Sequence, residues 1–368
     1  MLRVVKRLFA LLLGLGLPAL YACSTAGLVK PNTTVTPEED AEPTPVVEED
    51  GAVVLPDGAV VTPVPLTYID ALTVQVMPGD RGQSILDAIR GAKKSIHIEM
   101  YLLTNDAMIS ALRTAKQQGR EVQVVLNKDF PTGGNANAQA FTTLQNAGIE
   151  VVYAPPAFSF MHAKTMVIDG TSGWIMTMNF TQTSPQDNRE YLVRVTEPSE
   201  VSELETLFQA DFLNLAKDIP GRLVVSPATA TSLDAQKRLL ALLATATKEI
   251  VLEGESMSDT QIVDALVAAH KAGKNVRIIL NDQEGSPAQT TAVATVKAAG
   301  IPIVKVGTPD IHAKCIVVDR ARAYIGSQNF TPTSLLKNRE VGVLPQNATE
   351  IGKVMATIDA DFAKGVPF

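Results

Sequence analysis

Short runs of Val and Ile alternate with segments of helical periodicity through most of the chain. The run 95–100 is followed by a helical pattern and then by a second apolar run at 122–126. Apolar runs of this length that are rich in β-branched residues predict strands, and the apolar spacing at 84–92 and 259–272 predicts amphipathic helices. Strands that alternate with helices predict an α/β fold whose sheets are covered on both faces.

The same order of elements occurs twice. Glu99, in the first predicted strand, aligns with Glu253, and Asn127, after the second strand, aligns with Asn281, in each case 154 positions later. A repeat of this length has the size of a domain and not of a solenoid unit. We therefore expect a first lobe at 67–220 and a second lobe at 221–368.

The chain begins with a segment typical of an export signal. Three basic residues precede an uncharged apolar run at 8–20, which is shorter than the roughly 20 residues that a transmembrane helix needs. Residues 20–23 resemble a bacterial lipoprotein box, so we expect 1–23 to be a cleaved signal peptide and Cys23 to be lipidated. An uncleaved anchor is the alternative. Either way we expect an exported protein outside the cytoplasm, as a membrane-anchored lipoprotein or a secreted form.

Residues 24–66 are expected to be a disordered linker. They are rich in Pro, Thr and acids and show no helical or strand period that could bury a face. Such a tether would hold a folded body near a membrane surface. Its eight acids oppose one lysine and account for most of the net charge of −7, so the body at 67–368 is nearly neutral. A neutral body argues against a protein that mainly grips polyanions, because that grip needs many Lys and Arg contacts.

The repeat is tightest around two His-x-Lys motifs. Side chains two apart on a strand lie on the same side, so the His and the Lys can contact one ligand. Corresponding residues of the two copies are 150 positions apart; the pairs are His162 and His312, Lys164 and Lys314, Asp169 and Asp319, Asn179 and Asn329, and Glu190 and Glu340.

The pattern His-x-Lys-x4-Asp, with Asn ten residues after the Asp and an acid beyond it, resembles the paired motif of the phospholipase D superfamily. The resemblance covers residues 70–368. One such motif is a moderate signal, whereas two in phase are a strong one. The resemblance implies two pseudo-symmetric lobes, each a mixed β-sheet flanked by helices, whose two motifs face each other and form a single active site.

The same resemblance implies a metal-independent phosphodiesterase that acts through a covalent phosphohistidine. His162 would attack phosphorus, and His312 would protonate the leaving oxygen and then activate water. Two lysines and two asparagines would stabilise the five-coordinate phosphorus; these are Lys164, Lys314, Asn179 and Asn329.

Two pairs of acids complete the motif. By resemblance, Glu190 would hydrogen-bond the far nitrogen of His162, and Glu340 that of His312. The aspartates, Asp169 and Asp319, are expected to be structural. No metal or cofactor is expected, because the sequence has no His-Glu-x2-His, no cysteine pair and no carboxylate cluster at ligand spacing.

One position departs from the repeat. The second copy has Gly326 where the first has Met176. Because glycine allows backbone to approach a ligand closely, we expect Met176 to alter phosphate binding or pocket shape in the first half without abolishing activity.

The substrate is left open between three hypotheses. The leading one is hydrolysis or transfer of phospholipid head groups at a membrane surface, with a cardiolipin-synthase-like transferase as a variant. An endonuclease that uses the same site on nucleic acid is the alternative, and a binding module without turnover is the second alternative. An apolar lip beside the site would favour lipid, whereas a stripe of Lys and Arg would favour DNA. Since one chain carries both motifs, we expect a monomer.

Overall fold

The structure is a computed structural model that describes residues 64–215, 219–229, 234–282 and 286–368, together with three short strands between 46 and 61. The chain divides into two units, Met1–Val61 and Thr62–Phe368. The predicted signal peptide at 1–23 and the predicted lipidation site Cys23 lie outside the described residues.

Three two-residue strands occur within the segment that was expected to be a disordered linker. They are β1 (Val46–Val47), β2 (Val53–Val54) and β3 (Val60–Val61), and they pair in antiparallel order. These strands coincide with a Val-Val pair that recurs every seven residues, and the disordered linker at 24–66 stays a prediction. Valine favours the extended backbone of a strand.

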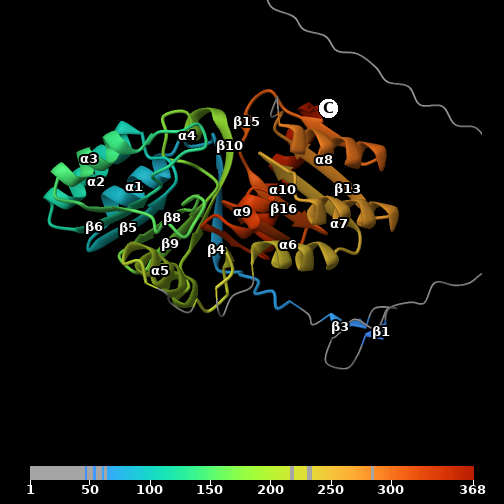
Figure 1. Cartoon of the computed structure of the whole chain (residues 1–368), viewed down its shortest axis with the longest axis horizontal. Coiled ribbons are helices and arrows are strands. Elements are labelled where there is room, and N and C mark those ends of the chain that lie inside the picture. The colour runs from blue at the N-terminus through green and yellow to red at the C-terminus, as the bar shows by residue number, and fades with distance from the viewer. Residues whose placement is uncertain are drawn as a thin grey trace, which may run out of the picture. The chain divides into compact units, whose positions relative to one another are not determined.

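The unit Thr62–Phe368 contains two sheets of similar construction (Figure 1). In the first sheet the order is β15-β10-β9-β8-β5-β6-β7, and β4 pairs with β10. Strands β5, β6 and β7 are parallel, β8 is antiparallel to β5 and β9, and β10 is antiparallel to β9 and β4. The bounds are β4 Leu72–Met77, β5 Ser95–Met100, β6 Glu121–Leu126, β7 Glu150–Tyr153, β8 Lys164–Ile168, β9 Ser172–Met176, β10 Asn188–Val195 and β15 Asp310–Ile311.

The second sheet repeats this mixed pattern in the order β11-β18-β17-β16-β12-β13-β14-β19. We call β4 to β10 with α1 to α5 the first half, and the chain from β11 onward the second half. The bounds are β11 Val224–Ser226, β12 Glu249–Gly254, β13 Asn275–Leu280, β14 Ile303–Lys305, β16 Lys314–Val318, β17 Arg322–Gly326, β18 Glu340–Val343 and β19 Val366–Pro367.

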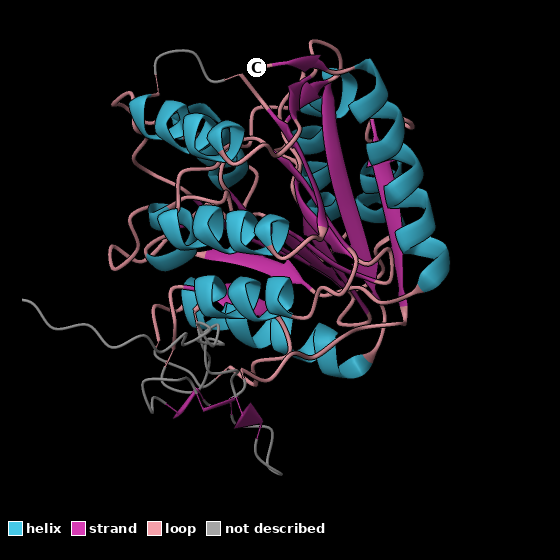
Figure 2. Cartoon of the chain, turned by 90° about the vertical axis from the view of Figure 1, so that its right-hand side faces the viewer, coloured by secondary structure: helices cyan, strands magenta, loops and turns pink. Residues whose placement is uncertain are grey.

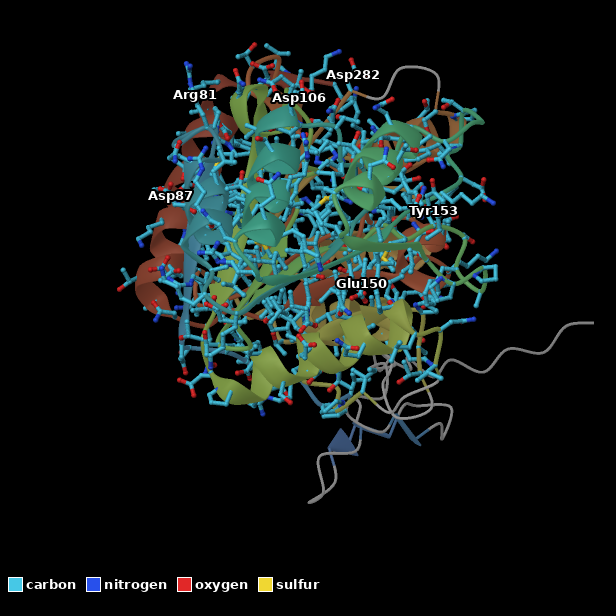
Figure 3. All side chains as sticks on the ribbon, turned by 90° about the vertical axis from the view of Figure 1, so that its left-hand side faces the viewer. Arg81, Asp87, Asp106, Glu150, Tyr153 and Asp282 are labelled. Carbon is cyan, nitrogen blue, oxygen red and sulfur yellow. The ribbon has the colours of Figure 1, made fainter. Side chains whose placement is uncertain are left out.

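Helices cover the outer face of each sheet, and Figure 2 shows those of the second half lying over their strands. Apolar residues of α1, α2 and α3 pack on the first sheet, and those of α6, α7 and α8 on the second. Figure 3 shows charged side chains such as Arg81, Asp87 and Asp106 on the outside of the first half. The bounds are α1 Gln83–Gly91, α2 Asp106–Gln117, α3 Ala138–Asn146, α6 Ala235–Ala244, α7 Thr260–Lys271 and α8 Pro287–Ala298.

A central apolar cluster joins the two halves. It contains the inner faces of both sheets together with α5 (Pro198–Phe212) and α10 (Ala348–Lys364). Two short helices, α4 (Ser184–Asp187) and α9 (Pro332–Leu336), precede β10 and β18. The predicted α/β fold, with two mixed sheets each flanked by helices on both faces, is confirmed. Within the described part of the chain, no helix has the length and apolar character needed to span a bilayer.

The two halves exchange backbone pairing at one edge. Strand β15 belongs to the second half but pairs in parallel with the start of β10, at Asn188 and Arg189. The counterpart contact is a bridge between Met161 and Arg339. Each of these pairings lies one residue before a motif histidine, so the exchange determines what the two histidines face.

Candidate active site

The backbone fixes each motif histidine against the opposite half. The amide of His162 donates to the carbonyl oxygen of Arg339 at 2.9 Å, and the amide of His312 donates to that of Arg189 at 3.3 Å. Each arginine directly precedes a motif glutamate. The exchanged strand pairing therefore brings each histidine next to the glutamate of the other half.

The histidine–glutamate pairs cross between the halves. Nδ1 of His162 lies 2.8 Å from Oε2 of Glu340, and Nδ1 of His312 lies 2.9 Å from Oε1 of Glu190. The predicted pairing within each half was wrong. Residues 150 positions apart fit both arrangements equally well, and only the parallel contact of β10 with β15 decides between them. Because the pairs cross, the two motifs form one site.

Each glutamate is fully buried and held by other polar groups. Glu190 accepts a hydrogen bond of 2.5 Å from Oγ1 of Thr177 and one of 3.3 Å from Asn188. Glu340 accepts one of 3.1 Å from Asn338. Sequence reasoning missed Thr177, although a hydroxyl recurs in phase 150 positions later. These bonds fix the carboxylates, which in turn fix the ring orientation of the histidines.

Charge shifts the protonation of the first histidine and its partners. Burial alone would raise the pKa of Glu340, but His162 and Lys164 hold it below its usual value. Burial lowers the pKa of His162, and the charge of Lys164 adds to this effect, although Glu340 opposes it. Because the pKa of His162 is lowered, the ring is neutral near neutral pH, and its Nε2 then has a free lone pair.

Both motif lysines are fully buried at the start of their strands. Nζ of Lys164 donates to the carbonyl oxygen of His162 at 2.6 Å, and Nζ of Lys314 to that of His312 at 2.7 Å. Burial lowers the pKa of Lys164 to about 7, although Glu340 opposes this shift. The short span of two residues thus places each cation beside its own histidine.

The motif asparagines follow β9 and β17. Among the described residues, the side-chain oxygens of Asn179 and Asn329 are buried and have no hydrogen-bond partner. Buried polar groups in folded proteins are normally paired, so unused capacity of this kind is typical of a ligand site.

Sequence reasoning missed the most asymmetric residue of the site, Glu255. Its Oε2 lies 2.7 Å from Nζ of Lys314 and 3.4 Å from Nε2 of His312. The corresponding residue of the first half, 154 positions earlier, is Tyr101. The alignment of Glu99 with Glu253 could have pointed to Glu255, because Tyr101 and Glu255 each lie two residues after a member of that pair.

The motif lysines begin β8 and β16, and the motif aspartates directly follow the last residues of the same strands. Asp169 accepts hydrogen bonds from the backbone amides of residues 93–95, and Asp319 from those of residues 247–249. Burial opposes ionisation, but these amides lower the pKa of Asp169 and bring that of Asp319 to about 2. Both carboxylates thus hold the turn that leads into a neighbouring strand.

Met176 does not contribute to the site. It is fully buried in the cluster beneath the outer helices of the first half. In the second half the same space is filled by Tyr324, because a Cβ on Gly326 would lie 2.4 Å from its hydroxyl oxygen. The expectation that Met176 shapes the phosphate pocket was therefore wrong, and the exchange of glycine for methionine is a core substitution.

Ion pairs behind the site also cross between the halves. Arg189 on β10 binds Asp361 on α10, with Nε 2.5 Å and Nη2 3.1 Å from the carboxylate oxygens. Arg339 binds Asp211 on α5 in the same way, at 2.6 and 3.0 Å. Both aspartates are buried. The segments that carry the motif glutamates are thus anchored to helices of the opposite half.

Aromatic side chains gather beside His162. The ring of Tyr101 lies 4.5 Å from that of His162, 5.0 Å from Phe130 and 6.4 Å from Phe160. A pocket of about 320 Å³ adjoins this group and is lined in part by Pro155, Pro156, Phe158 and Phe160. We call four aromatic residues and two prolines of this region together the aromatic lip: Tyr101, Phe130, Phe158, Phe160, Pro155 and Pro156.

Comparison with known proteins agrees with this geometry. A family model described as "Cardiolipin synthase, PLD-like domain" matches residues 85–212 and again 239–364. The minor cardiolipin synthase ClsB of Bacillus subtilis is 27% identical over 319 residues, which covers 77% of this chain and 79% of that protein. Cardiolipin synthase 2 of Bacillus anthracis is 23% identical over 322 residues, 76% of this chain but 62% of that protein.

A solved structure shares the fold. The phosphatidylserine synthase of Haemophilus influenzae superposes with a TM-score of 0.64 at 12% identity, over 82% of this chain and 89% of that one. At this level of identity the likeness concerns the fold alone.

The expected export of the chain conflicts with these relatives. Cardiolipin synthases are membrane enzymes of the cytoplasmic side, so the prediction of an exported, extracytoplasmic protein was wrong. That prediction depended entirely on residues 1–23, whose apolar run resembles a signal peptide.

Two copies of the family domain, each contributing a complete motif to one shared site, account for the fold and for the matches along the sequence. The chain belongs to the phospholipase D superfamily of phosphodiesterases and phosphatidyltransferases.

Proposed function

We propose that this protein transfers phosphatidyl groups between alcohols through a phosphohistidine on His162. The observation that carries the proposal is the crossed pairing of His162 with Glu340 and of His312 with Glu190, which makes one site from two motifs. One imidazole can then act as nucleophile while the other handles the proton. Since one chain supplies both, a monomer completes the site.

The reaction proceeds in two steps. Nε2 of His162 attacks phosphorus, the bond from phosphorus to the leaving oxygen breaks, and that oxygen takes a proton from Nε2 of His312. The acceptor alcohol then gives its proton to the neutral His312, its oxygen attacks phosphorus, and the bond from phosphorus to His162 breaks. Water as the acceptor would give hydrolysis by the same route.

The remaining motif residues stabilise the transition state. Lys164 and Lys314 bring positive charge to the oxygens of the five-coordinate phosphorus, in a site shielded from water. The side chains of Asn179 and Asn329 can donate to the same oxygens through their amide nitrogens, while their amide oxygens, unpaired among the described residues, can accept from the substrate. These groups hold the phosphoryl group while the two histidines act.

The aromatic lip favours a lipid over a nucleic acid. Tyr101 packs against His162 and contacts Phe160. Phe160 also lines the adjoining pocket together with Phe158 and two prolines, where acyl or glycerol groups of a phospholipid can pack. The segment that leads to His312, residues 306–311, contains no aromatic residue. A nuclease groove would instead present cations along the path of a phosphate backbone. The relatives named as cardiolipin synthases point the same way.

Radiolabelled phosphatidylglycerol and plasmid DNA, offered separately in EDTA, test the proposal. We expect conversion of the lipid to cardiolipin with release of glycerol, and intact DNA. Formation of phosphatidic acid instead would mean hydrolysis, DNA cleavage alone would identify a nuclease, and turnover of neither would favour a binding module.

Two variants test the proposed roles in the same assay. His162→Asn and His312→Asn should each lower the rate at least about 10³-fold, because each removes a nucleophile or a proton donor. A modest loss in either would contradict the assigned pair.

A further inference from the structure

The two halves of the active site differ at one charged position. Each histidine has a carboxylate on Nδ1 and a lysine two residues later. After β5, however, the first half places Tyr101 beside its histidine, whereas after β12 the second half places Glu255. This difference breaks a symmetry that otherwise makes the two histidines equivalent.

Glu255 is close to the reactive side of His312. Its Oε2 lies 3.4 Å from Nε2, the nitrogen opposite the one that Glu190 binds, and 2.7 Å from Nζ of Lys314. Although burial opposes ionisation, His312 and Lys314 hold the pKa of Glu255 below its ordinary value. His312 therefore faces a carboxylate oxygen at each ring nitrogen, and because a carboxylate oxygen only accepts, both nitrogens are placed to carry a hydrogen. The cation that also lies against the ring, Nζ of Lys314 at 3.2 and 3.3 Å, is itself paired with Glu255.

Tyr101 gives His162 different surroundings. Its ring packs edge-on against the imidazole, with centroids 4.5 Å apart, and Nζ of Lys164 lies 5.2 Å from the ring centre. Burial, together with Glu255 and Glu340, raises the pKa of Tyr101 to about 12, so the phenol is neutral. Among the described residues, His162 thus has one carboxylate within ion-pair distance, Glu340, and an uncharged ring at the position where His312 has a second anion.

We propose that Glu255 is a positioning residue that holds the proton on Nε2 of His312 and thereby makes this ring the proton donor, leaving His162 as the nucleophile. This inference depends on the proposed phosphodiesterase chemistry and adds to it the reason why two similar half-sites take different roles. Glu255 acts through His312 and Lys314, and it needs no contact with the substrate.

The consequence appears in the first step. When His162 attacks phosphorus, an alkoxide leaves only if it receives the proton that Glu255 helps to hold on His312. A p-nitrophenolate is stable enough to leave without that proton. The need for Glu255 should therefore depend on the leaving group.

Glu255→Gln, compared on two donors, tests this inference. With phosphatidylglycerol, whose leaving group is an alkoxide, we expect a loss of at least about tenfold. With phosphatidyl-p-nitrophenol, we expect the initial burst of p-nitrophenolate to change less than about threefold. Glu255→Asp keeps the charge and should recover part of the loss on phosphatidylglycerol. Exposed Glu197 provides the matched control, and Glu197→Gln should leave both rates unchanged.

Equal losses of Glu255→Gln on both donors would overturn the inference, because a structural defect does not depend on the leaving group. If the wild type fails on phosphatidylglycerol, the proposed lipid function is wrong, and the comparison is repeated with phenyl ethyl and p-nitrophenyl ethyl phosphate. Turnover of these lipid-free diesters with the same selective loss would support the role of Glu255 alone. Turnover of no diester at all would overturn both proposals.

Discussion

His162 and Lys164 set opposite limits on the pH range of the reaction. His162 must be neutral to attack, and burial lowers its pKa below the ordinary 6.5, so the competent form persists into mildly acidic solution. Lys164 must be charged to stabilise the transition state, and burial brings its pKa to about 7, so that charge is lost as pH rises through 7.

We therefore predict that kcat/KM falls at both ends of the range, with the acidic midpoint below 6.5 and a decline through about 7. This ratio reports ionisations of the free enzyme. The measurement is a pH profile with a soluble diester donor, which avoids the surface charge of a bilayer. A plateau that extends to pH 9 would contradict the environment described for Lys164.

The crossed pairs give a second prediction at this scale. Because Glu340 orients His162, Glu340→Gln should lower the burst with phosphatidyl-p-nitrophenol by about tenfold or more. Glu190→Gln acts on His312, so it should leave that burst nearly intact while it slows turnover of phosphatidylglycerol. The reverse pattern would indicate pairing within each half.

The sequence allowed every motif residue to be selected, because ten positions recur at one spacing. It did not allow the partners to be assigned, since the spacing of His162 to Glu190 and of His312 to Glu340 is the same in both halves. Glu255 escaped notice for the opposite reason: it differs from its counterpart Tyr101, so a search for repeated residues passes over it.

Packing around β17 explains why position 326 is a glycine, which the motif alone does not explain. A Cβ on Gly326 would lie 2.4 Å from the hydroxyl oxygen of Tyr324 and 2.5 Å from Cα of Gly342, which is backbone and cannot easily move. We predict that Gly326→Ala destabilises the protein by about 1–3 kcal/mol through overpacking. Urea denaturation measures the change in unfolding free energy.

Met176→Leu is the matched change in the first half, where the side chain already fills the core. It should cost less than about 1.5 kcal/mol, because the volume is conserved. A Gly326→Ala variant as stable as Met176→Leu would show that Tyr324 does not pack as described.

At the scale of elements, the alternation of strands and helices was predictable from the Val and Ile runs and the amphipathic segments between them. Two features were not. The strands β1 to β3 have only two residues each, too few for the alternation of apolar and polar residues within a strand to appear. Strand β15 is equally short and pairs with the opposite half, a contact between Ile311 and Arg189 that no local pattern encodes.

For the whole molecule, buried ion pairs between the halves couple folding to assembly of the site. Arg189 binds Asp361, whose side chain is fully buried. Of the described cations, Arg189→Met would leave that carboxylate with only the distant, exposed Lys364 at 3.8 Å, and we predict a loss of about 3–5 kcal/mol of unfolding free energy. Denaturant titration followed by two probes, fluorescence and circular dichroism, checks both the magnitude and the cooperativity.

An ion pair with one solvent-exposed partner on the same helix provides the comparison. Lys353 contacts Glu350 on α10, but the lysine side chain is 52% exposed, and the buried Glu350 keeps a hydrogen bond from the amide of Val74 when the lysine is removed. Lys353→Met should change the stability by less than about 1 kcal/mol. Equal effects of the two substitutions would mean that the buried pair between the halves contributes no more than a pair whose cation is exposed.

The most direct measurement of the central claim is to identify the residue that carries the covalent intermediate. His312→Asn should still react with phosphatidyl-p-nitrophenol, because that leaving group needs no proton, and it should accumulate a phosphatidyl adduct for lack of a base. Mass spectrometry of peptides prepared at alkaline pH, where phosphohistidine survives, then locates the adduct. The crossed site predicts one adduct per chain, on His162, and none in His162→Asn. An adduct on another residue, or one in the His162→Asn protein, would contradict the account.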